Sequence, residues 1–227
     1  MKTIAIIPAR SGSKGVINKN IRKLGNKTLI EYAVDVALSS GIDDVYISTD
    51  SAEYEKIAID KGAKSIGLRS KDLSGDNTKI VDVVIDLLDK LKLQKQEFNY
   101  VLLLQPTSPQ RNKDEINQIL QLIKNNQADA IVSLSKLEEP HPYKLKVINQ
   151  GKVIPFINSS DSEVSRQNHP AVYRLTGAYY LIKKDILYKE RTFLPVNTIP
   201  FITPNVVNID TEDDLIYANY LYEKDLL

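Results

Sequence analysis

The chain has 227 residues, 42% of them hydrophobic and 26% charged, and its 30 basic and 29 acidic residues leave a formal net charge of +1. This composition fits one globular α/β domain, and it excludes disorder and a global electrostatic attraction to nucleic acid or an anionic membrane. The chain has no cysteine, which excludes disulfides, thiolate metal sites and a cysteine nucleophile.

The N-terminal apolar run is interrupted by Pro8 and Arg10, so it is too short for the core of a signal peptide. No apolar stretch approaches the roughly 18 residues that a membrane span needs. We therefore expect a cytoplasmic protein that is attached to no membrane and binds any anion through local side chains.

Short apolar runs alternate with segments of helical periodicity along most of the chain. The first run, at residues 3–7, is rich in β-branched side chains, as in a strand that is buried on both faces of a sheet. The pattern predicts further strands at residues 45–48, 100–104, 130–134, 178–182 and 206–209, and helices at residues 28–37, 51–60, 78–91, 113–125 and from 211 onward. This order favours an α/β fold, a three-layer sandwich with a mostly parallel, Rossmann-like sheet.

The alternation of strands and helices stops after Pro140. Residues 143–148 and 151–157 flank an Asn149-Gln150-Gly151 turn, a pattern typical of a β-hairpin. This segment is too small to have its own core and is hard to bury within one subunit. We therefore expect a single domain over residues 1–227, a dimerisation arm or a lid at residues 141–172, and a two-fold homodimer.

Three clusters of polar residues follow predicted strands. They are PARSGSKG at residues 8–15, STD at residues 48–50 and QPTSPQR at residues 105–111. Ligands of open α/β sheets bind beyond the carboxyl ends of the strands, so the three clusters are expected to meet there. Arg10, Lys14 and Lys19 lie among small residues whose backbone can approach a ligand, and these cations suit a polyphosphate. Neither a Walker A loop nor a dinucleotide fingerprint is present, and a solvated turn is the alternative for the first cluster alone.

Six segments occur in the order and spacing of the acylneuraminate cytidylyltransferases, the CMP-sialic acid synthetase family, which the chain resembles. They are IIPARSGSKG with NKN, STD, LRSKDLSGD, LLQPTSPQR, SRQNHPAVYRLTGAYY and NIDTEDD, and they extend from Ile6 to Asp214. The resemblance implies a sheet of the nucleotide-diphospho-sugar transferase type. It also implies transfer of CMP from CTP to the C2 hydroxyl of a nine-carbon keto-sugar acid, an N-acylneuraminate, with release of pyrophosphate.

The resemblance also assigns roles to individual side chains. Arg10, Ser13 and Lys14 are expected to contact the triphosphate, with Arg10, Lys14 and Asp210 as the catalytic set. The remaining nucleotide contacts are expected from Lys19, Asn20, Arg69 and Gln105. The sugar acid is assigned to Lys144, Arg166, Gln167, Thr176 and Tyr180, within the excursion and the strand that follows it. An amide such as that of Gln105 has the donor and acceptors that reading a cytosine edge requires, although capping of the next turn is the alternative for this residue.

The resemblance implies a divalent cation, Mg²⁺ or another, at Asp210 and Asn208. Magnesium binds to a few carboxylates together with phosphate oxygens and water. The alternative for Asp210 is a cap of the helix that follows it. Asn208 stands where the family has aspartate and brings no charge, so affinity for the metal should fall unless Asp50, Asp213 or Asp214 compensates.

Two further departures concern the acceptor and a loop. Thr176 replaces the usual asparagine of the family and should alter the hydrogen bonds to the sugar, and Gln110 replaces a common leucine, which we interpret as a surface change. The acid is therefore open between sialic acid and a relative such as legionaminic or pseudaminic acid, and the QPTSP segment argues against CMP-Kdo synthetases. The motifs also leave open a different nucleotide-sugar enzyme of the same fold and a non-catalytic nucleotide-binding relative.

Overall fold

A six-stranded sheet forms the centre of the molecule. The structure is a computed structural model that describes residues 2–42, 44–157 and 169–226. The strand order is β10-β6-β9-β5-β1-β4. These strands are β1 (Thr3–Ala9), β4 (Asp44–Thr49), β5 (Tyr100–Leu103), β6 (Ala130–Leu137), β9 (Val172–Lys183) and β10 (Thr198–Ile202). Neighbours pair in parallel except β9, which runs antiparallel to both β5 and β6. The predicted α/β class with a mostly parallel sheet is confirmed.

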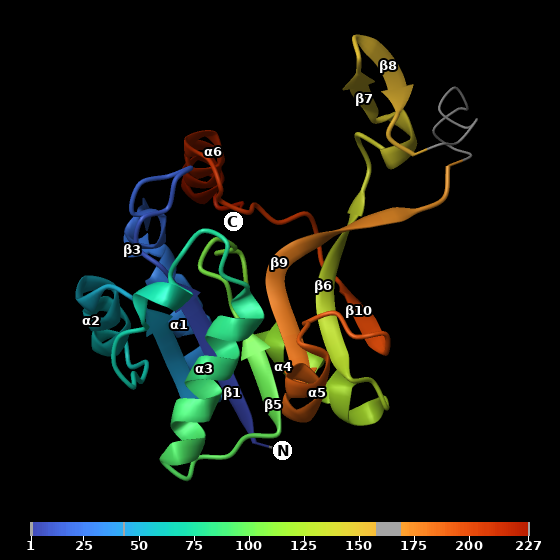
Figure 1. The fold of residues 1–227 in the computed structure, drawn as a ribbon. Coiled ribbons are helices and arrows are strands. Elements are labelled where there is room, and N and C mark those ends of the chain that lie inside the picture. The colour runs from blue at the N-terminus through green and yellow to red at the C-terminus, as the bar shows by residue number, and fades with distance from the viewer. Residues whose placement is uncertain (1, 43, 158–168, 227) are drawn as a thin grey trace.

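Helices cover both faces of this sheet (Figure 1). Successive side chains of β1 point alternately to the two faces, and both sets are buried. Ala5 and Ile7 pack into one buried cluster with α1 (Leu29–Ser39), α2 (Ala52–Asp60) and α4 (Lys113–Asn125). Ile4 and Ile6 point to the other face, where they pack with α3 (Ile80–Leu93) and α5 (Lys184–Glu190). A strand buried on both faces has no polar face, which explains its almost wholly apolar sequence.

The last helix, α6 (Glu212–Glu223), begins at a capping box. The Thr211 hydroxyl accepts from the backbone N–H of Asp214, whose carboxylate accepts in return from the Thr211 N–H. This reciprocal arrangement satisfies two N–H groups that a helix start leaves unpaired. α6 packs Leu215 and Ala218 into a small third cluster with Val16. No helix within the described ranges is both long and apolar enough to cross a membrane.

The segment before α6 differs from the prediction. Residues 206–209 are not a strand, and the edge strand β10 lies earlier in the chain. The N–H of Ile209 donates to the carbonyl of Thr107 at 2.8 Å, and the N–H of Val207 donates to Oε1 of Gln110 at 2.6 Å. The β-branched run therefore crosses beside the loop that follows β5, and the interpretation of Gln110 as a surface change is wrong.

The predicted hairpin is present and stands clear of the sheet. β7 (Lys146–Asn149) and β8 (Lys152–Pro155) pair antiparallel, and all their residues are exposed. In Figure 1, β6 and β9 extend beyond the sheet to carry this hairpin, which stands apart from the α-helices. Short 3₁₀ turns lie at Lys19–Ile21, Lys71–Leu73 and Pro142–Lys144, and a two-stranded ribbon of β2 (Lys23–Leu24) and β3 (Lys27–Thr28) precedes α1.

Candidate active site

A cavity of about 540 Å³ opens at the carboxyl ends of β1 and β5. The chain loops after these strands and the segment before α6 provide most of its wall. Its predicted members are Arg10, Ser13, Lys14, Lys19, Asn20, Arg69, Gln105, Asn208 and Asp210, and Leu73, Gly75, Asp76, Thr78 and Thr107 also line it. Residues up to 200 positions apart in the sequence therefore lie around one hollow, where an open α/β sheet places its ligand.

The loop after β1 is held by a carboxylate from the end of the neighbouring strand. Asp50 accepts from the backbone N–H of Ser11 at 2.7 Å and from the Ser11 hydroxyl at 2.9 Å. Partial burial disfavours the charged form of Asp50, but the hydrogen bonds from Ser11 outweigh it, so the pKa of Asp50 lies below its ordinary value. The buried Asn20 amide donates to the carbonyl of Arg10 at 3.0 Å. These contacts fix the backbone that carries Arg10.

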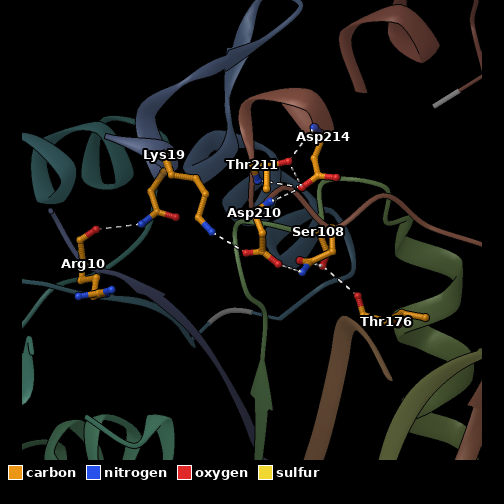
Figure 2. A network of polar contacts seen from close by, with 9 residues as sticks. Arg10, Lys19, Ser108, Thr176, Asp210, Thr211 and Asp214 are labelled. Atoms are coloured by element: carbon orange, nitrogen blue, oxygen red, sulfur yellow. Dashed lines mark hydrogen bonds and ion pairs between the residues drawn. The ribbon is translucent and has the colours of Figure 1, made fainter. Parts of the chain in front are cut away.

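Asp210 lies against this loop because residue 15 is glycine. A Cβ at Gly15 would lie 2.2 Å from the backbone oxygen of Asp210, too close for any other residue. Lys19 Nζ lies 2.7 Å from Oδ1 of Asp210, and Nδ2 of Asn208 donates to Oδ2 at 2.5 Å. Figure 2 shows the side chain of Lys19 reaching toward the carboxylate of Asp210. Both oxygens of Asp210 are therefore already hydrogen-bonded.

A second carboxylate, that of Asp76, forms ion pairs with both Arg10 and Lys14. Asp76 lies 2.7 Å from Nη1 of Arg10 and 2.6 Å from Nζ of Lys14, through one oxygen each. The hydrogen bonds from Lys14 and Arg10 hold the pKa of Asp76 below its ordinary value. With Lys19, Arg69 and Asp210, the described charges of the wall are four positive and two negative, a net of +2. A wall of this charge suits an anion of several charges.

Gln105 lies beside the stretch of β9 in which the regular pairing with β6 is interrupted. The register between β6 and β9 shifts between Val132 and Leu134, and Gly177 has φ +74 in the irregular stretch of β9. A Cβ at Gly177 would lie 3.1 Å from Oε1 of Gln105 and 3.0 Å from Oγ of Ser108. Glycine at this position therefore leaves the space that the Gln105 amide occupies at the cavity wall.

A half-buried arginine, Arg111, joins the loop of Gln105 to β9. Arg111 donates from Nε to the carbonyl of Ala178 at 2.7 Å, and its Nη2 contacts the carbonyls of Gln105 and Gly177. Burial lowers the pKa of Arg111 to about 10, although Tyr179 and Glu115 favour the cation. Because its hydrogen-bond partners here are carbonyls of two segments, the guanidinium fixes the distance between them.

Arg69 is buried beside the same cavity. Its Nη1 donates to the carbonyl of Ser48 at 3.4 Å and its Nε to the hydroxyl of Ser74 at 3.2 Å. Burial lowers the pKa of Arg69, while the charge of Asp50 opposes that effect. The guanidinium keeps donors available toward the cavity because these two bonds use two of its five N–H groups.

The donor set for a divalent cation is small. The described residues contain no group of three or more His, Cys, Asp or Glu side chains that could hold a metal. Of the carboxylates proposed to compensate for Asn208, Asp50 binds Ser11 and Asp214 caps α6, and neither lines the cavity. Asp210 with the Asn208 carbonyl still fits a magnesium site of one carboxylate, because that ion takes its remaining ligands from phosphate and water.

The described residues assigned to the sugar acid, Lys144, Thr176 and Tyr180, do not line this cavity. Thr176 is buried, and its hydroxyl lies 2.6 Å from that of Ser133. Tyr180 packs edge-on to Phe193, with ring centroids 6.0 Å apart, on the α3 face of the sheet. Lys144 Nζ lies 3.8 Å from Glu139 at the base of the hairpin. Arg166 and Gln167 fall outside the described residues.

Sequence reasoning misses the contacts that Asp50, Asp76 and Arg111 make. It assigns no role to Asp76 or Arg111, and it names Asp50 only as a carboxylate that could compensate for Asn208 at the metal. All three belong to the segments that carry the resemblance, so a signal is present in the sequence. Their partners are a backbone N–H, two cations and three carbonyls, and only the folded chain brings these together. Residue type alone does not distinguish them from solvated charges.

The family model described as cytidylyltransferase matches residues 4–200. The chain belongs to this family. It is therefore a nucleotidyltransferase, and the resemblance inferred from its six motifs is confirmed.

Relatives with three different acceptor names are about equally similar. The CMP-N,N'-diacetyllegionaminic acid synthase of Legionella pneumophila is 32% identical over 98% of this chain and 97% of that protein. The pseudaminic acid cytidylyltransferase of Campylobacter jejuni is 32% identical over 98% of this chain and 97% of that protein. The N-acylneuraminate cytidylyltransferase of Streptococcus agalactiae is 33% identical over 96% of this chain, which spans 52% of that longer protein.

Solved structures share the fold. The CMP:2-keto-3-deoxy-manno-octonic acid synthetase complexed with CTP superimposes with a TM-score of 0.73 at 19% identity, over 100% of both chains. The 4-diphosphocytidyl-2C-methyl-D-erythritol synthase of Anaerococcus prevotii gives a TM-score of 0.62 at 16% identity over 97% of this chain and 98% of the other.

Proposed function

We propose that this nucleotidyltransferase moves CMP from CTP to the C2 hydroxyl of a nine-carbon keto-sugar acid, forming the CMP-sugar and pyrophosphate. The observation that carries the proposal is the single cavity that brings together Arg10 and Gln105, which follow the neighbouring strands β1 and β5, and Asp210 from the segment before α6. Its net charge of +2 would balance a triphosphate of about −4 with one divalent cation bound. Relatives of similar length are named for the cytidylyl transfer to nonulosonic acids.

In the proposed reaction the C2 oxygen attacks the α-phosphorus in line with the leaving pyrophosphate. Arg10 and Lys14 would donate to phosphate oxygens and offset charge that develops on them, a stabilisation that a pre-formed site supplies at little reorganisation. Ser13 and Lys19 would add donors at the same phosphates. Asn20, Arg69 and Gln105 would hold the cytidine. Each of these side chains lines the cavity.

A divalent cation, taken as Mg²⁺, would be held by Asp210 and the carbonyl oxygen of Asn208. When bound, it supplies charge neutralisation at the phosphates. The Asn208 amide orients the Asp210 carboxylate through the 2.5 Å hydrogen bond. With one carboxylate in place of two, we expect activity to require a higher magnesium concentration than a site with two aspartates would.

The acceptor half would be completed by a second copy of the chain. The hairpin exposes Ile148, Val153 and Phe156 at 80%, 69% and 62%, which is unfavourable for a surface left in water. A two-fold homodimer would cover these side chains and bring Lys144, with Arg166 and Gln167, toward the cavity of the partner. Thr176 and Tyr180 would then adjoin the acceptor from β9.

N-acylneuraminate is the first acceptor that we propose, and N,N'-diacetyllegionaminate is the second because of the Legionella relative. The test is pyrophosphate release with a panel of free nonulosonic acids and Kdo, each with the four nucleoside triphosphates. We expect turnover with CTP and a free nonulosonic acid, in a protein that works in the cytoplasm. Turnover only with a sugar phosphate would point to another nucleotide-sugar enzyme, and CTP binding without turnover would point to a non-catalytic relative.

A further inference from the structure

Asp76 forms ion pairs with Arg10 and Lys14, the two cations that are proposed to bind the triphosphate. Its oxygens lie 2.7 Å from Arg10 and 2.6 Å from Lys14, and all three residues line the cavity. Carboxylate and phosphate oxygens make the same charge-assisted hydrogen bonds with guanidinium and ammonium groups. A polyphosphate at Arg10 and Lys14 would also bring its own negative charge against Asp76. The two anions therefore compete for the same donors.

We propose that Asp76 is an internal counterion that a polyphosphate must displace from Arg10 and Lys14, and that it thereby selects ligands with more than one phosphate group. A single phosphate group carries a charge of about −1.5 to −2 at pH 7, against about −4 for a triphosphate, so it gains less from the exchange. A triphosphate carries enough charge to satisfy both cations and exclude the carboxylate. The inference rests on the proposed function only in taking a nucleoside triphosphate as the natural ligand.

The surroundings of Asp76 permit this exchange. The side chain is 40% exposed, and those of Arg10 and Lys14 are 33% and 81% exposed. Ion pairs in contact with water are weak, so displacing this carboxylate is easily offset. Asp76 also lines a second cavity of about 710 Å³, together with Asp72 and Arg191. The displaced carboxylate therefore has space and water available to it.

The experiment measures binding by calorimetry for wild type and Asp76→Asn, with inorganic tripolyphosphate, CTP, CDP and CMP as ligands. We expect Asp76→Asn to bind tripolyphosphate and CTP about three- to tenfold more tightly than wild type, because two exposed ion pairs no longer have to be broken. For CMP we expect a change of less than about twofold. Asp76→Glu, which keeps the charge, should behave like wild type.

Asp72→Asn is the matched control. Asp72 is exposed on the same loop, and it lines the second cavity but not the first. Its replacement removes the same charge without freeing Arg10 or Lys14. We expect tripolyphosphate affinity within about twofold of wild type for this variant, because an exposed charge beyond contact distance is screened by solvent.

Three results would overturn the inference. They are equal tightening by Asp72→Asn and Asp76→Asn, an unchanged or weaker affinity of Asp76→Asn for tripolyphosphate, and no measurable tripolyphosphate binding by either protein. Binding of tripolyphosphate needs neither cytidine nor turnover. If the acceptor panel gave no pyrophosphate while Asp76→Asn still bound tripolyphosphate more tightly, the proposed function would fail and the inference would stand.

Discussion

The nucleotide cavity and the excursion at residues 141–172 differ in how complete they are in one chain. The cavity draws its wall from the loops after β1 and β5, from residues 69–83 and from the segment before α6, and three of its four described cations are paired with carboxylates of the same wall. The hairpin of the excursion, in contrast, has apolar side chains exposed to water and contributes nothing described to the cavity.

This difference teaches that the donor and acceptor halves of the proposed reaction depend on different levels of organisation. Folding of a single chain suffices to place Arg10, Gln105 and Asp210 around one hollow. The described acceptor residues Lys144 and Tyr180 lie outside it, so assembly or acceptor binding has to complete that half. Four changes separate the two contributions, from the largest expected effect to the smallest.

Arg10→Ala should have the largest effect. We expect kcat/KM for CTP in the pyrophosphate-release assay to fall on the order of 100- to 1,000-fold, because a donor to the reacting phosphates is lost. Arg22→Ala is the control, since Arg22 pairs with Glu212 outside the cavity. Activity of Arg10→Ala within tenfold of wild type would show that the cavity is not the donor site.

Charged residues on the hairpin should reduce turnover with the acceptor and leave CTP binding unchanged. For the double variant Ile148→Lys and Val153→Lys we expect a monomer by sedimentation, turnover reduced on the order of 100-fold, and unchanged CTP affinity, because the acceptor is no longer positioned. Ile216→Lys on α6 is the control, at a site 67% exposed. A fully active monomer would contradict the proposed dimer.

Gly177→Ala should reduce base discrimination. The new Cβ would press on the Gln105 amide at 3.1 Å, so we expect the preference for CTP over UTP to fall about tenfold, as for a lost hydrogen bond. Gly41→Ala has a similar positive φ of +79 but no heavy atom within 4 Å, and it controls for backbone strain alone. Equal loss of discrimination in both variants would rule out a specific role for this contact.

Asp50→Asn should have a small effect that depends on pH. We expect the variant to be less stable at pH 7 by about 1 kcal/mol, or a Tm lower by about 2–4 °C. Because the pKa of Asp50 is lowered in the folded protein, its contribution is present above the unfolded value of about 3.9 and is lost as the pH falls through the folded value. Melting curves of both proteins should therefore converge in acid, and a gap that widened there would contradict this account.

The sequence predicted the architecture and the convergence of several polar side chains on one cavity. Strand ends are recognisable where an apolar run meets polar residues, and parallel strands bring those ends to one edge. Arg10 and Gln105 could therefore be expected to converge. Asp210 joins them, but not from the end of the strand predicted at residues 206–209, which the structure does not have. The hairpin followed from Gln150 and Gly151, which both adopt the positive φ that a tight hairpin turn requires.

Other features could not be predicted because they depend on long-range partners. Residues 206–209 have the pattern of a buried strand, and only the bond from Ile209 to Thr107 shows that they follow a loop instead. Asp76 is an ordinary loop carboxylate until Arg10 and Lys14 fold against it. Arg111 resembles a surface charge by residue type, and its hydrogen bonds to two carbonyls of β9 and to one of its own loop form only in the folded chain.

The path of the chain around the excursion bears on whether this segment can be exchanged between related proteins. The segment leaves the sheet from β6 and returns through β9, and these strands are paired at Leu137 and Val172. Everything between those two residues is thus a closed insertion with a hydrogen-bonded junction. A chimera that carries the corresponding insertion of a relative at this junction should keep its CTP affinity and acquire the acceptor preference of the donor of the insertion.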